Sequence, residues 1–365
     1  MGEHAEYGPL VSDWPDQRFL ALSGARLPIV QAPMAGAGGV ALAVGAIKGG
    51  AVGSLPCAML TPDQVRAQVA EVRAQVDGPL NLNFFCHSMP EAPDETAWRA
   101  LLSTYYDQER VSPPAGPARL RQPFDDAMCA VVEELRPTFA SFHFGLPEEP
   151  MIQRIWAVGT HVVGNATTPE EAALLALRGC DAIVAQGFEA GGHAGYFLID
   201  EHRPVGLLAL VRQIAVNQNV PIIAAGGIVD AQGVAAALML GASAVQIGTA
   251  YLATPESLIA PPHRERLGTL HAEDTVFTNL FSGREARGMR NMLIHLEGPI
   301  RPEVPPFPYA SAALAPLRAA AEADGRGDYS QMWAGQAASI VSPSGAQDLT
   351  ERLGREALAL LSGKA

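Results

Sequence analysis

Short apolar runs alternate with longer amphipathic segments from Pro28 onward, and this alternation limits the fold more than any other feature of the chain. Each run has the length of a β-strand and is apolar throughout, which is typical of parallel strands buried on both faces. The eight runs are Ile29–Ala32, Ala51–Leu55, Leu80–Phe84, Phe139–His143, His161–Asn165, Ala182–Gln186, Pro221–Ala225 and Ala244–Gly248. Eight strand–helix units in succession predict an α/β fold, namely a (β/α)8 TIM barrel.

Helix-start signals separate several of these runs. Thr61 and Pro62 supply a capping side chain and a first-turn proline for a helix over Gln64–Val76. Asp230 is placed to cap a helix over Gln232–Leu240 in the same manner. These signals predict that helices connect consecutive strands, as a barrel requires.

A doubly wound open sheet is the main alternative fold. The segment Met34–Gly39 follows the first run and is rich in glycine. It lacks the dinucleotide-binding fingerprint, in which an acidic residue follows the glycine turn by about 20 positions. The barrel is therefore the favoured fold.

Three parts of the chain fall outside the strand–helix repeat. Residues 1–27 form an N-terminal extension to a barrel of residues 28–260. The Pro-rich, polar stretch Met89–Arg121 follows the third strand, and we interpret it as an insertion at the C-terminal face of the barrel, a candidate lid. Residues 261–365 form a C-terminal extension expected to pack on the barrel or over its mouth. Its predicted helices are Ala310–Ala323, Gln331–Val341 and Gln347–Leu361.

Charge and cysteine content exclude several classes of partner. The formal net charge of −13 argues against nucleic acids and anionic membrane surfaces. The four cysteines form no CxxC pair or metal-like spacing, which fits a reducing cytoplasm. The N-terminus shows no signal peptide, and the apolar runs are too short to span a bilayer. We therefore expect a cytoplasmic protein, and a homodimer remains open.

Glycines end the seventh and eighth predicted strands. Gly226 and Gly227 follow the seventh strand, and Gly248 precedes Thr249 at the end of the eighth. Barrel active sites lie at the C-terminal ends of the strands, where phosphate often binds between these two loops. Glycine lets a phosphate reach backbone N–H groups directly, and Thr249 adds a hydroxyl donor. The two loops predict a phosphate site; the competing interpretation is that these glycines only turn the chain.

The other strand ends offer mostly neutral polar side chains. A Schiff-base enzyme would need a lysine there, but Lys48 and Lys364 lie elsewhere. A magnesium or zinc site would need several converging acids, cysteines or histidines, and Glu189 is the only acid in the set. We therefore expect no metal. The residues at these strand ends are Met34, Asn83, His143, Asn165 and Gln186.

The amides among these residues suit a flavin. Amide side chains both donate and accept hydrogen bonds, which matches the alternating N–H and C=O edge of a flavin's pyrimidine ring. Together with the phosphate loops, they predict FMN as the cofactor. The rival is a flavin-free barrel that acts on a phosphorylated metabolite.

Two histidines lie close to the predicted pocket. His193 follows the sixth strand in a glycine-rich loop, and an imidazole pKa near 6.5 suits proton abstraction at neutral pH. A solvent-facing loop histidine is the alternative. His143, flanked by Phe142 and Phe144, is either a pocket residue or a packed one. Nothing nearby in the sequence would activate Cys57, so we interpret it as structural.

Several motifs resemble those of the nitronate monooxygenases. The segments that carry the resemblance are Ile29–Met34, Asn81–Phe85, Ser141–Gly145, Ala185–His193, Ala224–Ile228, Gln246–Thr249 and Trp333–Gln336. They are spread over most of the chain. The resemblance implies an FMN barrel that uses O₂ to oxidise alkyl nitronates to a carbonyl compound and nitrite.

The same resemblance implies roles for individual residues. His193 would be the base that deprotonates neutral nitroalkanes, whereas a nitronate anion would not need it. The insertion, His143 and Tyr309 would shape the substrate pocket. The residues that would contact FMN are Met34, Asn83, Gln186, Gly191, Gly227, Gln246, Ile247, Gly248 and Thr249.

Related barrels keep two other functions open. The same fold and phosphate loops occur in NAD(P)H-dependent flavin reductases of enoyl thioesters or quinones, which form the alternative function. A non-catalytic barrel that binds a phosphometabolite is the third. Rapid flavin bleaching by a nicotinamide without nitrite would indicate the reductase.

Overall fold

The computed structural model describes residues 13–116, 120–269 and 271–364. Eight parallel strands form one sheet in the order β1-β9-β8-β6-β5-β4-β3-β2. They are β1 (Ile29–Gln31), β2 (Gly53–Pro56), β3 (Leu80–Phe85), β4 (Phe139–His143), β5 (His161–Ala166), β6 (Ala182–Gln186), β8 (Ile222–Ala225) and β9 (Ala244–Ile247). A parallel bridge between Val30 and Val52 joins β1 to β2 and closes the sheet. The predicted TIM barrel is confirmed.

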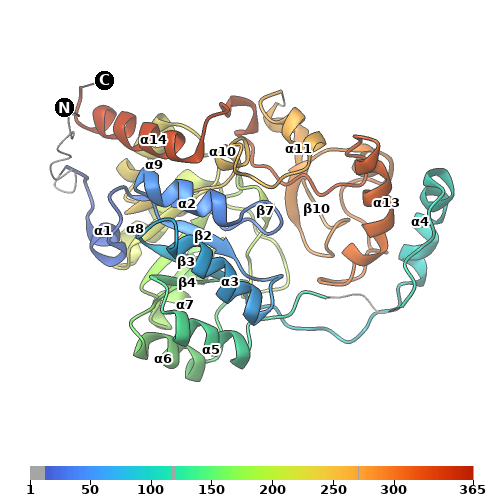
Figure 1. Ribbon diagram of the computed structural model, residues 1–365, viewed down its shortest axis with the longest axis horizontal. Helices are drawn as coiled ribbons and strands as arrows, with labels where there is room; N and C mark the ends of the chain where they lie inside the picture. The colour runs from blue at the N-terminus through green and yellow to red at the C-terminus, as the bar shows by residue number, and fades with distance from the viewer. Residues whose placement is uncertain (1–12, 117–119, 270, 365) are drawn as a thin grey trace.

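Helices surround the sheet (Figure 1). They are α2 (Val40–Gly49), α3 (Pro62–Arg73), α5 (Asp126–Leu135), α6 (Glu149–Ala157), α7 (Pro169–Leu177), α8 (Leu207–Asn217) and α9 (Ala231–Met239). The predicted caps are present: the Thr61 side chain accepts from Gln64 N, and Asp230 Oδ1 accepts from Gly233 N at 2.9 Å. Directly after β9, where the eighth helix of the barrel is expected, the chain forms only the four-residue helix α10 (Thr249–Leu252).

The C-terminal helix completes the ring of helices. α14 (Ala346–Leu361) packs against both α2 and α9, which lie beside it in Figure 1. Two glycines of α2 allow this close approach: a Cβ on Gly45 would lie 2.7 Å from Ala346 Cβ, and one on Gly49 would lie 2.5 Å from Thr350 Cβ. A segment about 100 residues beyond β9 therefore supplies the barrel layer that α10 is too short to provide.

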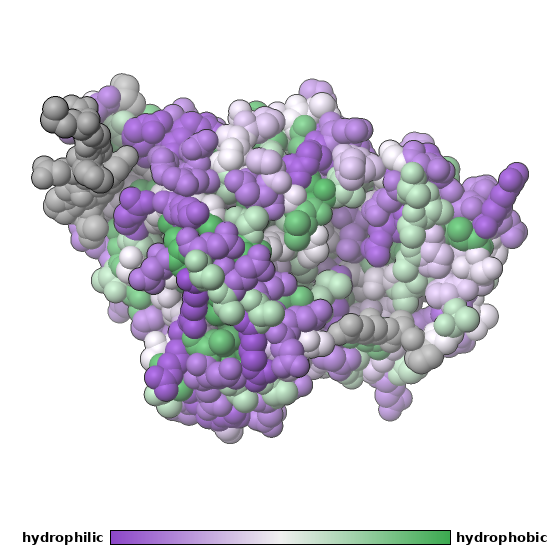
Figure 2. Space-filling model, in the orientation of Figure 1, coloured by the Kyte–Doolittle hydropathy of each residue, from purple (hydrophilic) through white to green (hydrophobic). Residues whose placement is uncertain are grey.

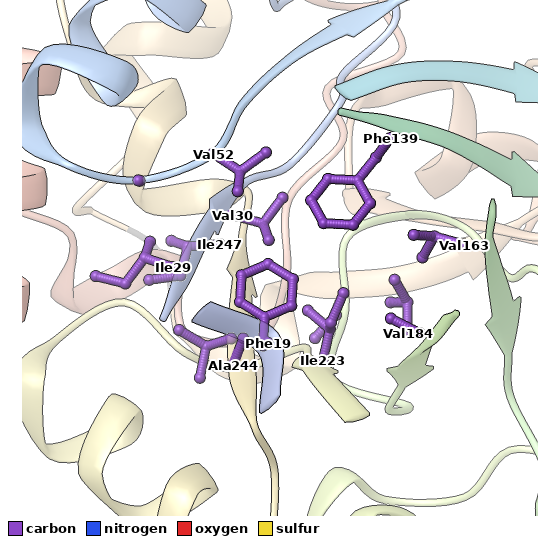
Figure 3. Packing of buried hydrophobic residues seen from close by; sticks show 14 of the residues in the cluster. Phe19, Ile29, Val30, Val52, Phe139, Val163, Val184, Ile223, Ala244 and Ile247 are labelled. Atoms are coloured by element: carbon purple, nitrogen blue, oxygen red, sulfur yellow. The ribbon is translucent and has the colours of Figure 1, made fainter. Parts of the chain in front are cut away.

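A helix before the first strand covers the N-terminal end of the barrel. α1 (Arg18–Ser23) buries Phe19 completely, and its ring stacks on Phe139 of β4 with centroids 5.7 Å apart. Figure 3 shows Phe19 and Phe139 among the branched side chains that the strands contribute, including Val163, Val184 and Ile223. With one end of the barrel filled by this core, the C-terminal ends of the strands are left to form a site. The residues before 13 lie outside the described part of the chain.

The inserted segment and the C-terminal extension share a second apolar core. The insertion contains α4 (Thr96–Glu109), which packs on α13 (Ser311–Ala323) at the side of the barrel (Figure 1). Tyr106 donates from its hydroxyl to the Ala313 carbonyl at 2.6 Å. The buried side chains of this core include Trp98, Leu102, Leu293, Leu314, Leu317 and Tyr329. A lid function for the insertion stays a prediction.

A small antiparallel sheet was not expected from the sequence. It pairs β10 (Thr275–Thr278) with β11 (Ala286–Met289), and β11 with the two-residue strand β7 (Gly192–His193). The remaining short elements are α11 (Pro261–Arg266), η2 (Ala272–Asp274), α12 (Met292–Glu297) and η3 (Ala338–Ile340).

One predicted helix is wrong. The stretch Gln331–Val341 is mostly irregular, with η3 as its only helical turn. Trp333 forms an antiparallel bridge with Gly288 of β11, and backbone pairing of this kind is incompatible with a helix. The predicted helices near Ala310–Ala323 and Gln347–Leu361 correspond to α13 and α14. No helix in the described ranges is both long and apolar enough to cross a membrane.

Candidate active site

The C-terminal ends of the barrel strands converge on a cavity of about 500 Å³. This volume lies within the usual range for ligand pockets, about 300–1,000 Å³. The predicted site residues that line the cavity are Met34, Asn83, His143, Gln186, Gly191, His193, Gly227, Gln246, Gly248 and Thr249. Figure 2 shows hydrophilic and hydrophobic residues interspersed over one face of the molecule.

The backbone of His193 is held from three directions. As part of β7, it is in register with Ala286 of β11. Its carbonyl oxygen accepts hydrogen bonds from Gln186 Nε2 at 2.8 Å and from His143 Nε2 at 3.2 Å. The imidazole is anchored as well, because its Nε2 lies 3.0 Å from Ser282 Oγ. The loop histidine of the sequence is thus a fixed side chain on the cavity wall.

Aromatic rings enclose the imidazole of His193. Four ring centroids lie 5.5–6.2 Å from that of His193, belonging to Phe85, Phe144, Phe307 and Trp333. Burial among these rings lowers the pKa of His193 well below its usual value of 6.5, and nearby Arg121, His143, Arg284 and His87 lower it further. His193 is therefore neutral at pH 7, which is the state that can accept a proton.

His143 lines the cavity, and its ring also forms a hydrogen bond to the backbone of His193. A carbonyl oxygen can only accept, so His143 Nε2 carries the proton in its bond to the His193 carbonyl. Burial, followed by the charge of Arg284, lowers the pKa of His143 to about 4. A neutral His143 is compatible with both a clamp on the His193 backbone and the predicted pocket position.

Some side-chain amides at the cavity already form hydrogen bonds within the protein, whereas others can still bind a ligand. Gln186 Oε1 accepts from Asn165 Nδ2 at 3.0 Å and from Gly195 N at 2.9 Å, while its Nε2 holds His193. Asn83 Nδ2 donates to Ser141 Oγ at 3.0 Å, and Asn83 lines the cavity. Gln246 makes no side-chain hydrogen bond within the described ranges. Asn83 and Gln246 are thus the amides most free to bind a ligand.

The two glycine turns lie on the same side of the cavity. Gly226 and Gly227 have left-handed φ angles of 124° and 67°, a backbone conformation that favours glycine. Gly248 and Thr249 follow the neighbouring strand β9. Thr249 Oγ1 accepts from Gly335 N at 3.0 Å, so its hydroxyl proton remains able to donate to a ligand.

The loop after Trp333 is packed tightly behind these turns. A Cβ on Gly191 would lie 2.6 Å from the Ala334 carbonyl carbon, and one on Gly335 would lie 2.7 Å from the Glu189 carbonyl oxygen. Neither position has room for a side chain. The C-terminal motif thereby supports the sixth-strand loop and Thr249 together.

Two predicted site residues do not face the cavity. The Ile247 side chain is completely buried in the barrel core, and its carbonyl oxygen is already bonded to Ala32 N at 2.9 Å. Tyr309 instead donates from its hydroxyl to the Pro90 carbonyl at 3.1 Å, which ties the insertion to the loop before α13. The neighbouring Phe307 contacts His193 in its place.

Sequence reasoning missed two arginines on the cavity wall. Arg121 ends the inserted segment, and Arg318 lies on α13. The Nε and Nη1 atoms of Arg121 are buried and unbonded, and its guanidinium lies 5.7 Å from the Phe307 ring. Burial, and then the charge of Arg318, lowers the pKa of Arg121. Nothing in the local sequence signals that either cation turns inward.

The cavity is cationic as a result. Among the described lining residues the only carboxylate is Glu322, and its Oε1 already accepts from Ser330 Oγ at 2.7 Å. A buried guanidinium without a counterion is costly unless an anion binds it. The described ranges also contain no group of three or more His, Cys, Asp or Glu side chains that could hold a metal ion.

Comparison with known proteins decides the family. The family model for nitronate monooxygenase matches residues 17–356. The chain belongs to the nitronate monooxygenase family. A curated member from Pseudomonas aeruginosa, named nitronate monooxygenase, is 40% identical over 345 residues, covering 93% of this chain and 98% of that protein. The family is one of flavin-dependent oxidoreductases, so this member is an oxidoreductase as the sequence predicted.

Solved structures agree with this membership. A nitroalkane oxidase from Streptomyces ansochromogenes superposes with a TM-score of 0.85 at 33% identity, covering 95% of this chain and 100% of its own. FabK from Thermotoga maritima superposes with a TM-score of 0.72 at 25% identity, covering 95% and 97%. The family member described here therefore shares its whole architecture with both proteins.

Proposed function

We propose that this family member uses FMN and O₂ to oxidise alkyl nitronates to a carbonyl compound and nitrite, and that neutral nitroalkanes enter after deprotonation by His193. One observation carries the proposal. A single cavity joins two glycine turns suited to a phosphate, a buried neutral imidazole and an arginine whose Nε and Nη1 have no hydrogen-bond partner among the described residues. The nitronate monooxygenase and nitroalkane oxidase relatives support the choice of substrate.

The residues present fit FMN. Gly227, Gly248 and Thr249 would hold the phosphate, because their backbone and hydroxyl donors line one end of the cavity. Asn83 and Gln246 would bond the polar edge of the ring, with Met34 against its face. When bound, the flavin supplies the electron acceptor for the substrate and the means of reaction with O₂. None of the described residues that line this cavity is a cysteine.

The side chains of the cavity bind the substrate and move its proton. Arg121 and Arg318 would attract the negatively charged nitro or nitronate oxygens. His193 would accept the proton from the α-carbon of a nitroalkane, since it is neutral and buried. The rings of Phe85, Phe144, Phe307 and Trp333 would exclude water from the base. A nitronate is already deprotonated, so it would require the arginines for binding but not His193 as a base.

The decisive experiment is anaerobic mixing of the purified protein with propyl-2-nitronate and, separately, with NADPH. We expect a yellow protein whose flavin is reduced by the nitronate, and nitrite release once air is admitted. Bleaching by NADPH without reduction by the nitronate would favour the second candidate, a NAD(P)H-dependent flavin reductase. The similarity to FabK makes that comparison necessary. A colourless protein that takes up no FMN would reject both functions.

We also propose a cytoplasmic location, and a division into an N-terminal extension, a barrel with an insertion, and a C-terminal extension. Gel filtration with light scattering would establish the oligomeric state.

A further inference from the structure

The hydroxyl of Ser282 lies between two partners. Its Oγ is 3.0 Å from His193 Nε2 and 3.0 Å from the carbonyl oxygen of Arg284. Ser282 is 1% exposed, so bulk water does not compete for these bonds. This serine has no part in the proposed function.

The proton count of this arrangement fixes the tautomer of His193. A serine hydroxyl has one proton to donate, and the Arg284 carbonyl can only accept. The Ser282 proton therefore goes to the carbonyl, and a lone pair of Oγ is left for His193. Nε2 must then carry the imidazole proton and donate it to Oγ. In a neutral imidazole the other nitrogen, Nδ1, is consequently unprotonated.

We propose that Ser282 is a positioning residue that holds His193 as its Nε2–H tautomer, so that Nδ1 is the atom that accepts the substrate proton. This inference rests on the proposed function. In the step it serves, the C–H bond at the α-carbon of the nitroalkane breaks and its electron pair stays on the substrate as the nitronate. The proton forms a new N–H bond at Nδ1. The resulting imidazolium keeps its Nε2–H bond to Ser282.

The fold holds Ser282 firmly in this position. Ser282 lies in the turn before β11, and β11 pairs with β7, which carries His193. Ala194 N donates to the Glu285 carbonyl at 3.0 Å and extends this pairing. Gly283 has a φ of 85°, and a Cβ there would lie 2.5 Å from Phe307 N, so the turn packs directly on the segment that carries Phe307. Neither the serine nor the histidine can shift independently.

Charged groups around His193 explain why a serine suits the position. The titratable and charged groups that act on it are Arg121, His143, Arg284 and His87, all cationic or neutral. Within the described ranges no carboxylate bonds its ring. A carboxylate partner would stabilise the imidazolium and raise the pKa of the base. A hydroxyl that only accepts a hydrogen bond from Nε2 orients the ring and leaves the resting imidazole neutral. The imidazolium formed after proton transfer can then release the substrate proton readily.

The tautomer can be read directly by ¹⁵N NMR of the holoenzyme labelled with ¹⁵N-histidine. His193 is assigned from the signals that disappear in His193→Asn. We expect Nδ1 at the chemical shift of an unprotonated ring nitrogen and Nε2 at that of a protonated one. In Ser282→Ala we expect both signals to move toward the average of two tautomers. A protonated Nδ1 in the unmutated protein would overturn the proposal.

Kinetics with two substrates distinguish a positioning role of Ser282 from a general structural role. Ser282→Ala should lower kcat/KM for nitroethane by about tenfold or more, since the imidazole loses its fixed orientation and part of it also takes the wrong tautomer. Turnover of ethyl nitronate should change by less than about twofold, because that substrate skips the proton transfer. Ser282→Thr keeps the hydroxyl and should restore both the NMR pattern and the nitroethane rate. Ser243→Ala removes a buried hydroxyl bonded to Asp16, away from the cavity, and is the matched control.

Each outcome points to one proposal. Equal losses on nitroethane and ethyl nitronate in Ser282→Ala, with an unchanged NMR pattern, would show a structural serine and overturn the inference. No nitronate turnover by the unmutated protein would reject the proposed function instead. The NMR measurement would still report the tautomer in that case, because it requires no reaction.

Discussion

Gln186 Nε2 donates a hydrogen bond of 2.8 Å to the carbonyl oxygen of His193, while Gln186 Oε1 accepts from Asn165 Nδ2 and Gly195 N. The amide that the sequence assigns to the cofactor thus also ties the sixth strand to the loop that carries the base. This relationship makes Gln186 a structural centre of the site, whatever contact it makes with a ligand.

Replacing Gln186 by Leu should therefore loosen His193. The variant leaves the Gly195 N–H and the Asn165 amide without partners, which costs about 1–3 kcal/mol for each buried group left unbonded. We expect a lower urea midpoint and a larger loss of kcat/KM for nitroethane than for ethyl nitronate. Gln153→Leu, an exposed change on α6, is the control. An unchanged urea midpoint in Gln186→Leu would show that this hydrogen-bond network does not stabilise the fold.

Substitution of His193 by Asn should separate the two substrates. Nitroethane turnover is expected to be lost, because no base remains, whereas ethyl nitronate turnover should be largely kept. The pH dependence follows from the lowered pKa of His193. A base with a lowered pKa is deprotonated and active at neutral pH, and it loses activity only as the pH falls below 6.5 toward that lowered value. A kcat/KM profile for nitroethane that is still rising above pH 7 with the pKa of a free imidazole would contradict the buried, neutral base.

The glycine turn after β8 can be tested with a control glycine that has the same φ angle. Gly227 and Gly363 both have a φ of 67°, so an alanine at either position pays a similar left-handed penalty of about 1–2 kcal/mol. At Gly227 the new Cβ would also meet Glu189 Cβ at 3.3 Å, whereas nothing lies within 4 Å at Gly363. We expect Gly227→Ala to be purified with much less flavin, as measured by absorbance per protein. Equal flavin content in the two variants would remove this turn from the phosphate site.

Local patterns in the sequence are sufficient to predict the barrel, but not to predict how the segments outside the strand–helix repeat pack on it. The strands and their helices are predicted correctly because each depends on periodicity and caps within a few residues, as at Thr61 and Asp230. β7 is only two residues long and rich in glycine, so no pattern could reveal its pairing with β11. The same holds for α14, whose place in the ring of helices depends on close packing against Gly45 and Gly49.

The candidate site shows the same division. Strand-end residues such as Asn83 and His193 follow from the geometry of a barrel, because the carboxyl ends of its strands meet at one face. Arg121 could not be placed this way, since it comes from an irregular inserted segment whose path is set by contacts with α13 and Phe307. The prediction for Tyr309 failed for the same reason: the loop turns its hydroxyl to Pro90 and its neighbour Phe307 to the histidine.

Acid should weaken the fold through its buried histidines. Burial lowers the pKa values of His87 and His263 to about 4, whereas an unfolded histidine titrates near 6.5. Protons then bind the unfolded chain more tightly, so stability is constant above about pH 6.5 and falls between there and about pH 4, by up to about 1.4 kcal/mol per pH unit for each group. Urea unfolding at pH 7.5 and 5.5 measures this difference.

A substitution isolates the contribution of one histidine. His263→Asn should reduce the loss of stability between pH 7.5 and 5.5, because one titrating group is gone. His271→Asn changes an exposed histidine and should leave the loss as it is. A stability difference that is the same in the unmutated protein and in His263→Asn would show that His263 does not contribute to it.

Arg121 should affect substrate binding and stability in opposite directions. Its guanidinium is buried at the cavity wall and forms no ion pair with any described residue, so Arg121→Met removes a charge that none of them compensates and should raise the melting temperature of the protein without substrate. The same change removes a charge-assisted bond to the nitronate, worth about 1.5–3 kcal/mol, and should raise KM for ethyl nitronate by about 10- to 100-fold. Arg110→Met, at an exposed position after α4, should change neither quantity. An unchanged KM together with a lower melting temperature would mean that Arg121 holds the fold rather than the substrate, and Arg318 would then be the remaining cation for the anion.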